Sequence, residues 1–216
     1  MTSLRSTVAI LIISLWALLM ASSAKGGIDF TPAVMEYVAL GMKHQQIRFK
    51  HDKRIIEFEP PSGWKFDGSP DRIRLAPPQK NFAEAFITAT PLSKPQSLDE
   101  NTLKLLEEPA LAGLPVGSQF AKVEEEIPNS VLVGGNGSFE IILSYQSMGE
   151  KFWRSVLVVN LPDTQLKFRL TAKKDDFQSL RREFKASILS WHWIDSDSTR
   201  DQVDGTATTP ETGFAR

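Results

Sequence analysis

The side chains best suited to acid–base or metal chemistry are the three histidines, His44, His51 and His192. A zinc site needs at least three ligands that converge on one point, and helical sites often place two histidines four residues apart. His44 and His51 are seven residues apart, and His192 lies far along the chain, so their spacing matches no metal motif. The sequence therefore predicts solvated loop histidines, with no metal and no cofactor.

Two other kinds of chemistry find little support in the motifs. Gly134-Gly135-Asn136-Gly137 could surround a phosphate, but no Lys-Ser or Lys-Thr follows it, and the next expected element is a strand. A hairpin turn is the favoured interpretation. No Gly-x-Ser-x-Gly elbow is present, so a serine hydrolase of that type is unsupported. Paired acids could act as in a glycosidase, but the three glutamates at 124–126 are more simply a solvated edge or face.

Residues 191–193, Trp-His-Trp, are the most unusual local sequence. Alternate residues of an extended segment face the same side, so the two indoles could form an aromatic patch for a sugar or a hydrophobic partner. The interpretation we favour is that Trp191 completes the apolar stripe of a preceding helix and Trp193 covers a sheet edge. Trp191, His192 and Trp193 are the candidate binding patch, and the sequence predicts no catalytic residue.

The elements that would position these side chains lie mainly between residues 137 and 193. Apolar and polar residues alternate over 139–146, 152–161 and 165–173, which predicts three strands. The pattern then changes to helical spacing, and a helix over 175–191 is expected. We predict that the strands pair antiparallel in chain order and that the helix packs on the sheet through its stripe, Phe177, Leu180, Phe184, Ile188 and Trp191.

Upstream, the pattern predicts a β hairpin over 46–50 and 54–60, followed by shorter strands. Ser97 and Glu100 form a capping box for a helix over 97–108. Residues 25–44 are interpreted as a linker, in which Val34, Tyr37 and Val38 have the spacing of a short helical turn.

Charge and cysteine content exclude several classes of function. Arg5 is the one charged residue among the first 24, so the remainder has 24 basic and 26 acidic residues and a net charge of −2. Without a basic excess, nucleic acid is not expected as a partner. The chain has no cysteine, which excludes thiol catalysis, disulfides, thiolate zinc sites and a lipidated cysteine.

The two ends of the chain differ in composition from the rest. Residues 8–20 are an apolar run of about 13 residues after Arg5, and small residues follow at 22–24. This arrangement predicts a signal peptide over 1–24, since a bilayer span needs about 20 apolar residues. A retained membrane anchor over 8–24 is the alternative. Either way, a domain over 45–194 is exported to the periplasm or the exterior, and the polar residues 195–216 are predicted to form a disordered tail.

The order of elements resembles that of the PsbP-like superfamily. This group includes the photosystem extrinsic subunit, a Ran-binding import factor and bacterial exported proteins of the DcrB type. The resemblance covers residues 45–194 and rests on 58–64 (Phe-Glu-Pro-Pro-Ser-Gly-Trp), Asn81, 97–100 (Ser-Leu-Asp-Glu), the strand pair 139–146 and 152–160, and 177–191. It implies an α+β fold in which an antiparallel β-sheet is flanked by helices as an α/β/α sandwich. It also implies an interaction role without catalysis, and no site residue carries over.

The function expected from these observations is that of an exported, non-enzymatic binding or accessory domain of the cell envelope. Its partner would be an unknown protein or envelope component, and it would contact the membrane only if the N-terminal segment is retained. One alternative is a small-ligand carrier with a pocket between the sheet and the helix over 97–108. A hydrolase that uses acids or His51 is the least favoured interpretation.

Overall fold

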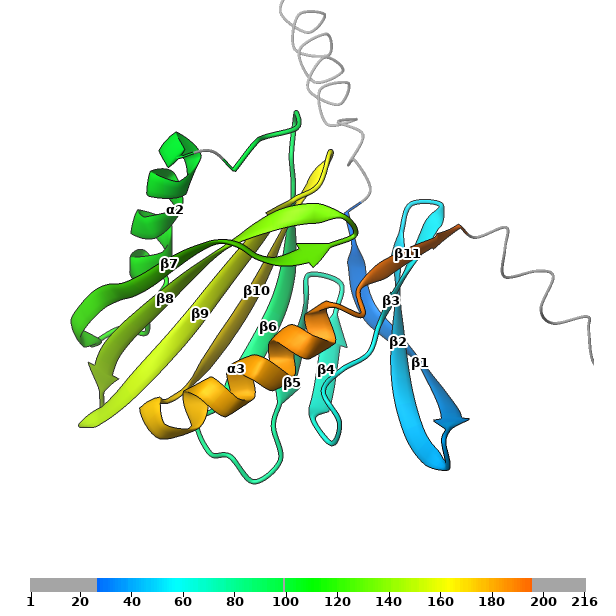
Figure 1. Ribbon diagram of the computed structural model, residues 1–216, viewed down its shortest axis with the longest axis horizontal. Coiled ribbons are helices and arrows are strands. Elements are labelled where there is room, and N and C mark those ends of the chain that lie inside the picture. Colours follow the sequence, from blue (N-terminus) through cyan, green and yellow to red (C-terminus); the bar gives the residue numbers. More distant parts are fainter. Residues whose placement is uncertain (1–26, 99, 196–216) are drawn as a thin grey trace, which may run out of the picture.

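The structure is a computed structural model that describes residues 27–98 and 100–195 (Figure 1). The predicted signal peptide lies outside the described residues, and so does the predicted tail after Asp195. Within the described part of the chain, no helix combines the length and the apolar character that a membrane span requires.

A seven-stranded antiparallel sheet forms the larger part of the molecule, with strand order β4-β5-β6-β10-β9-β8-β7. Its central strands β8, β9 and β10 pair in chain order, as their alternating sequences predict. The strands are β4 (Lys65–Ser69), β5 (Arg72–Ala76), β6 (Glu84–Pro91), β7 (Gln119–Val133), β8 (Asn136–Ser147), β9 (Glu150–Asn160) and β10 (Thr164–Lys173).

A smaller four-stranded sheet lies beside it, with order β1-β2-β3-β11. Its strands are β1 (Asp29–Ala39), β2 (Met42–His51), β3 (Arg54–Phe58) and β11 (His192–Asp195). The predicted hairpin is confirmed, since β2 and β3 pair antiparallel. The helical turn predicted within 25–44 is wrong, because this segment is the strand β1 and pairs with β2. Its β-branched and aromatic residues suit a strand once that partner is present.

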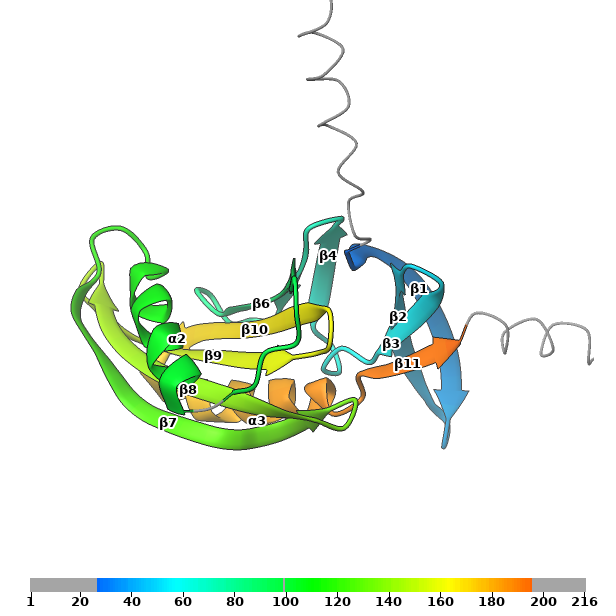
Figure 2. The same cartoon turned by 90° about the horizontal axis from the view of Figure 1, so that it is seen from above.

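One helix covers each face of the large sheet (Figure 2). Helix α2 (Glu100–Ala112) packs on one face over a small apolar cluster, and α3 (Lys174–Ile188) packs on the other. The α+β class and the antiparallel sheet are as predicted. The prediction of a single α/β/α sandwich is wrong, because the described chain has a second sheet, part of which lies in the segment predicted to be a linker.

The main core joins both sheets. The α3 side chains Phe177, Leu180, Phe184 and Ile188 are buried against the large sheet, as their spacing predicts. Phe30, Phe49 and Phe58 of the small sheet belong to the same buried cluster. The helix ends at Ile188, earlier than the predicted 191. The two sheets and α3 are therefore held together by continuous apolar contact.

Candidate functional site

Trp191 does not contribute to a surface patch, since only 2% of it is exposed. Its ring lies 5.5 Å from that of Phe168, 5.8 Å from Phe58 and 5.9 Å from Phe49, measured between ring centroids. It closes the core just after the end of α3, so its indole is unavailable to a ligand.

The other two members of the predicted patch lie in β11 and have separate surroundings. Trp193 is partly buried, 5.2 Å from the ring of His51 and under the guanidinium of Arg54 at 4.5 Å. His192 is about half exposed, with Nε2 3.0 Å from Glu57 Oε2 and Nδ1 2.7 Å from the carbonyl oxygen of Ser190. The structure therefore does not bring Trp191, His192 and Trp193 together as one binding surface.

The prediction of loop histidines is wrong for all three, because each lies in a strand. His44 stacks on Tyr37 with 5.1 Å between ring centroids, and His51 is buried. The histidines lie in strands because β2 and β11 pair with β3. A local turn signal such as His51-Asp52 does not reveal this pairing. Among the described residues, no three histidine or acidic side chains are grouped to hold a metal ion. Nδ1 of His51 also has no hydrogen-bond partner in this part of the chain, so the geometry gives no support to a His51 hydrolase.

The glycine-rich run after β7 is a hairpin turn, as predicted. Gly134 and Gly135 have φ angles of +55° and +81°, a backbone region that glycine enters at little cost. Asn136 then begins β8, so no helix N-terminus is present to bind a phosphate.

Exposed apolar side chains of the described chain are concentrated on the β1–β2 hairpin, which projects from the molecule (Figure 1). Residues 33–38 of β1 are exposed at odd and even positions alike, so neither face of this segment packs on the core. Thirteen large hydrophobic side chains are exposed in the described part of the chain, and six of them lie within residues 34–42. The six are Val34, Met35, Tyr37, Val38, Leu40 and Met42.

The turn of this hairpin carries a residue that local energetics disfavour. Leu40 and Gly41 have φ angles of 52° and 75°, and Leu40 is 97% exposed. Two-residue hairpin turns of this kind favour asparagine or glycine at the first position, because a bulky side chain is strained there. Leu40 therefore gains neither burial nor a relaxed backbone at this position.

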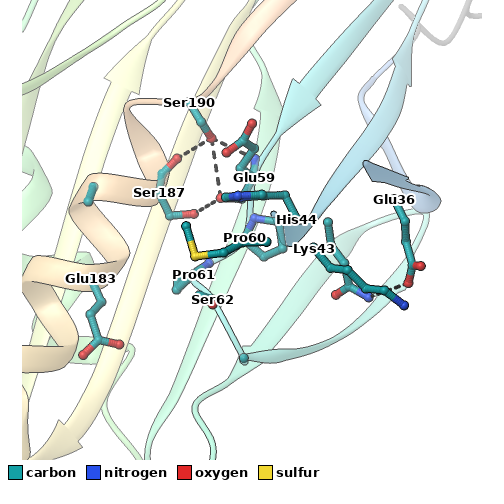
Figure 3. Close-up of a pocket in the computed structure, with 14 residues that line it drawn as sticks. Glu36, Lys43, His44, Glu59, Pro60, Pro61, Ser62, Glu183, Ser187 and Ser190 are labelled. Atoms are coloured by element: carbon teal, nitrogen blue, oxygen red, sulfur yellow. Dashed lines mark hydrogen bonds between the residues drawn. The ribbon is translucent and has the colours of Figure 1, made fainter. Parts of the chain in front are cut away.

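A groove of about 730 Å³ lies between the hairpin and α3 (Figure 3). Glu36, Lys43 and His44 line it from the hairpin, and residues 60–63 form another wall. Carboxylates outnumber cations along it, because Glu59 and Glu183 also face the groove.

The serines of the groove hold the end of β3 against α3. Ser190 Oγ accepts a hydrogen bond from the Glu59 amide at 2.8 Å, and Ser187 Oγ donates to the Glu59 carbonyl (Figure 3). Across the same residue, Tyr37 Oη donates to the Glu59 carboxylate at 2.6 Å. That hydrogen bond raises the pKa of Tyr37. These contacts connect the base of the projecting hairpin to the end of α3 through Glu59. The polar residues of the groove therefore have a structural role.

Comparison with known proteins gives structural likenesses. No family model matches the chain, and no curated protein matches it in sequence. Similar solved structures include the cyanobacterial PsbP of Synechocystis, at 11% identity and a TM-score of 0.48, covering 81% of this chain and 96% of that one.

Two further solved structures are similar over comparable lengths. LpqN of Mycobacterium tuberculosis, described as involved in cell envelope biogenesis, is 16% identical, with a TM-score of 0.46 and coverage of 77% of this chain and 91% of that one. A Pseudomonas aeruginosa protein of unknown function is 13% identical, with a TM-score of 0.39 and coverage of 72% and 94%.

Proposed function

We propose that this protein is an exported, non-enzymatic accessory domain of the cell envelope that binds a protein partner through its β1–β2 hairpin. The observation that carries the proposal is the concentration of exposed apolar side chains on residues 34–42 of this projecting hairpin. The apolar run over residues 8–20 supports export.

Fold stability does not account for this hairpin. A two-stranded ribbon is at best marginally stable in water, and contiguous apolar surface commonly marks an interaction site. The side chains of Val38 and Leu40 lie far from the core and remain mostly exposed. A partner that covered them would recover the hydrophobic free energy that folding leaves unused, about 25 cal/mol per Å² buried.

The backbone of the hairpin favours a protein over a small molecule. β1 is an outer strand of its sheet, and its only strand partner in the described chain is β2. The free edge can accept a strand of another protein, whose main chain supplies hydrogen bonds while its side chains cover Val34, Met35 and Val38. The polar residues Glu36, Lys43 and Gln45 would then form the rim of the interface.

The alternative of a carrier with a pocket beneath the helix over 97–108 receives less support. Apolar side chains of α2 and the loop after it fill the space against β8 and β9. They pack on a cluster made of Phe139, Ile141, Leu143, Val156 and Val158.

Site-specific photocrosslinking in the native envelope tests the proposal. A photoreactive residue at Val38 should crosslink a distinct envelope protein, whereas the same residue at Leu105, also exposed but on α2, should not. The double variant Val38→Ser, Leu40→Asn, probed from Met35, should lose the adduct, and Leu105→Ser should retain it. Crosslinks only to a second copy of this chain, or adducts unchanged in the double variant, would overturn the proposal.

A further inference from the structure

A hollow of about 740 Å³ opens on the face of the large sheet that carries α2. It lies beyond the end of the helix, next to Pro115, and strands β5, β6, β8, β9 and β10 contribute side chains to it. The hollow belongs to a different sheet from the β1–β2 hairpin and shares no lining residue with the groove of Figure 3.

Arg154 is the buried cation of this hollow, with 6% of the residue exposed. Its Nε donates to Thr171 Oγ1 at 2.9 Å, and its Nη1 donates to the Gly113 carbonyl at 2.6 Å. The guanidinium also lies 5.6 Å from the ring centroid of Tyr145. These partners are all neutral, and no carboxylate of the described chain lies within ion-pair distance of Arg154. A buried charge is costly without such a partner.

The other cations that line the hollow are already paired. The ion pairs are Arg74–Glu84 at 3.2 Å, Lys80–Asp176 at 2.7 Å and Lys173–Glu150 at 3.1 Å. The acids at the rim are thereby used, and the positive charge of Arg154 is left over. Burial is the main cause that lowers the pKa of Arg154, and the nearby charge of Arg169 lowers it further, while Tyr145 and the more distant Glu84 act in the opposite direction. A bound anion would stabilise the charged guanidinium and so offset the cost of its burial.

One part of the wall of the hollow is apolar, and two of its residues have a strained backbone. Phe82 has a φ angle of 66° and Met148 one of 52°, yet both are large side chains and both are mostly exposed. Residues other than glycine are strained in this backbone region. Phe82 meets Phe152 edge to face at 6.5 Å, and Phe152 stacks on Tyr145 at 5.6 Å. Strained, exposed apolar residues beside an unpaired cation suggest a ligand surface.

We propose that this hollow binds a small amphipathic anion, with one carboxylate or phosphate head group on Arg154 and an apolar body along Phe82, Met148 and Phe152. A planar guanidinium with free donors suits either head group, because both accept two parallel hydrogen bonds. The single unpaired cation matches one head group, and the aromatic rings match a chain or ring attached to it. This site is additional to the partner surface on the hairpin and does not depend on it.

The test is calorimetric titration of the full-length protein with dodecanoate, dodecyl phosphate, dodecanol and inorganic phosphate, all below micelle-forming concentrations. At least one amphipathic anion should bind, with dodecanol and inorganic phosphate each at least about tenfold weaker. The comparison of dodecanoate with dodecyl phosphate assigns the head group. Equal binding of dodecanol would overturn the role of Arg154, and equal binding of inorganic phosphate would overturn that of the apolar wall.

Variants locate the binding. Arg154→Gln should weaken the anion at least about tenfold, since it removes a charge-assisted pair of hydrogen bonds. Phe82→Asn should also weaken it, and because Phe82 is exposed and strained, this variant should fold even if Arg154→Gln does not. Arg182→Gln, on the exposed side of α3, is the matched control. All variants contain the apolar residues 8–20, so any ligand that binds to this run contributes equally to every titration. If Phe82→Asn and every folded Arg154 variant bind like Arg182→Gln, the site is elsewhere.

Discussion

At the scale of single residues, the carboxylate of Glu140 is inaccessible to solvent beneath α3 and is held by several hydrogen bonds. Arg181 donates to both of its oxygens at 2.7 Å, and Ser155 Oγ donates to Oε1 at 2.6 Å. Ser130 also donates to Oε2 and accepts from Lys185 Nζ at 2.7 Å. Burial alone would raise the pKa of Glu140, but the hydrogen bonds and the charge of Arg181 together lower it to about 2.

This carboxylate should make the fold sensitive to acid. Its pKa falls from 4.5 to about 2 on folding, so its contribution is present above about pH 4.5 and is lost as the pH falls towards 2. The contribution is on the order of 3 kcal/mol. Urea unfolding at pH 6 and pH 3 should show a large loss for the native chain and a smaller one for Glu140→Gln. Glu126→Gln, at an exposed position of β7, should behave like the native chain. A parallel pH dependence in Glu140→Gln would contradict the assignment.

Arg154 and the Trp-His-Trp segment differ in how far the sequence reveals their surroundings. Arg154 interrupts the apolar row Phe152, Val156 and Val158 on one face of β9, and this break is visible in the alternation. Whether Arg154 has a carboxylate partner depends on which side chains β6, β8 and β10 place around it. No local sequence pattern reveals that arrangement. The Trp-His-Trp segment is unusual in composition. The burial of Trp191, however, follows from the way β11 returns to β3.

At the scale of elements, periodic segments with short connections are the ones that the sequence predicts. The helical stripe of α3 and the alternation of β8, β9 and β10 are local patterns, and each strand meets the next through a short turn. β11 is only four residues long and pairs with β3 across most of the chain. β1 has exposed apolar residues at odd and even positions, so it lacks the alternation that identifies a strand.

Phe184 provides a test of how α3 packs. Its buried ring stacks on Trp64 at 6.2 Å and meets Phe168 at 6.5 Å. Phe184→Ala should lower the free energy of unfolding by about 3–5 kcal/mol, because it removes a ring from the core and leaves a cavity. Chemical denaturation gives this value, with the exposed Leu189→Ala as a control expected within about 0.5 kcal/mol of the native chain. A loss below about 1 kcal/mol would mean that the stripe does not face the sheet.

At the scale of the whole molecule, the two sheets meet where the start of β1 crosses β4. The Phe30 amide donates to the Pro70 carbonyl at 3.2 Å, and the Phe30 ring lies edge-on to Phe49 at 5.3 Å. This crossing anchors one end of β1 while residues 33–39 continue outward as the projecting hairpin. The hairpin and the hollow thus belong to different sheets of one body, which allows the two proposed sites to be tested separately.

Gly68 in β4 allows the crossing to be tested directly. A Cβ at this position would lie 2.4 Å from the Phe30 carbonyl oxygen and 2.6 Å from Pro32 Cδ. One of these atoms is backbone and the other belongs to a rigid ring, so neither can move aside as a flexible side chain would. Gly68→Ala should therefore push β1 away from β4 and lower the free energy of unfolding by about 1–3 kcal/mol.

Hydrogen exchange should show where that loss occurs. In Gly68→Ala, amides of β1 and β2 should exchange faster, while those of β8 and β9 follow only the global change in stability. Gly27→Ala is the matched control, because a Cβ there meets nothing within 4 Å. If the two variants have the same stability and the same exchange in β1, the sheets are not held together at Gly68. Selective exchange in β1 would instead show that this one contact couples the projecting hairpin to the large sheet.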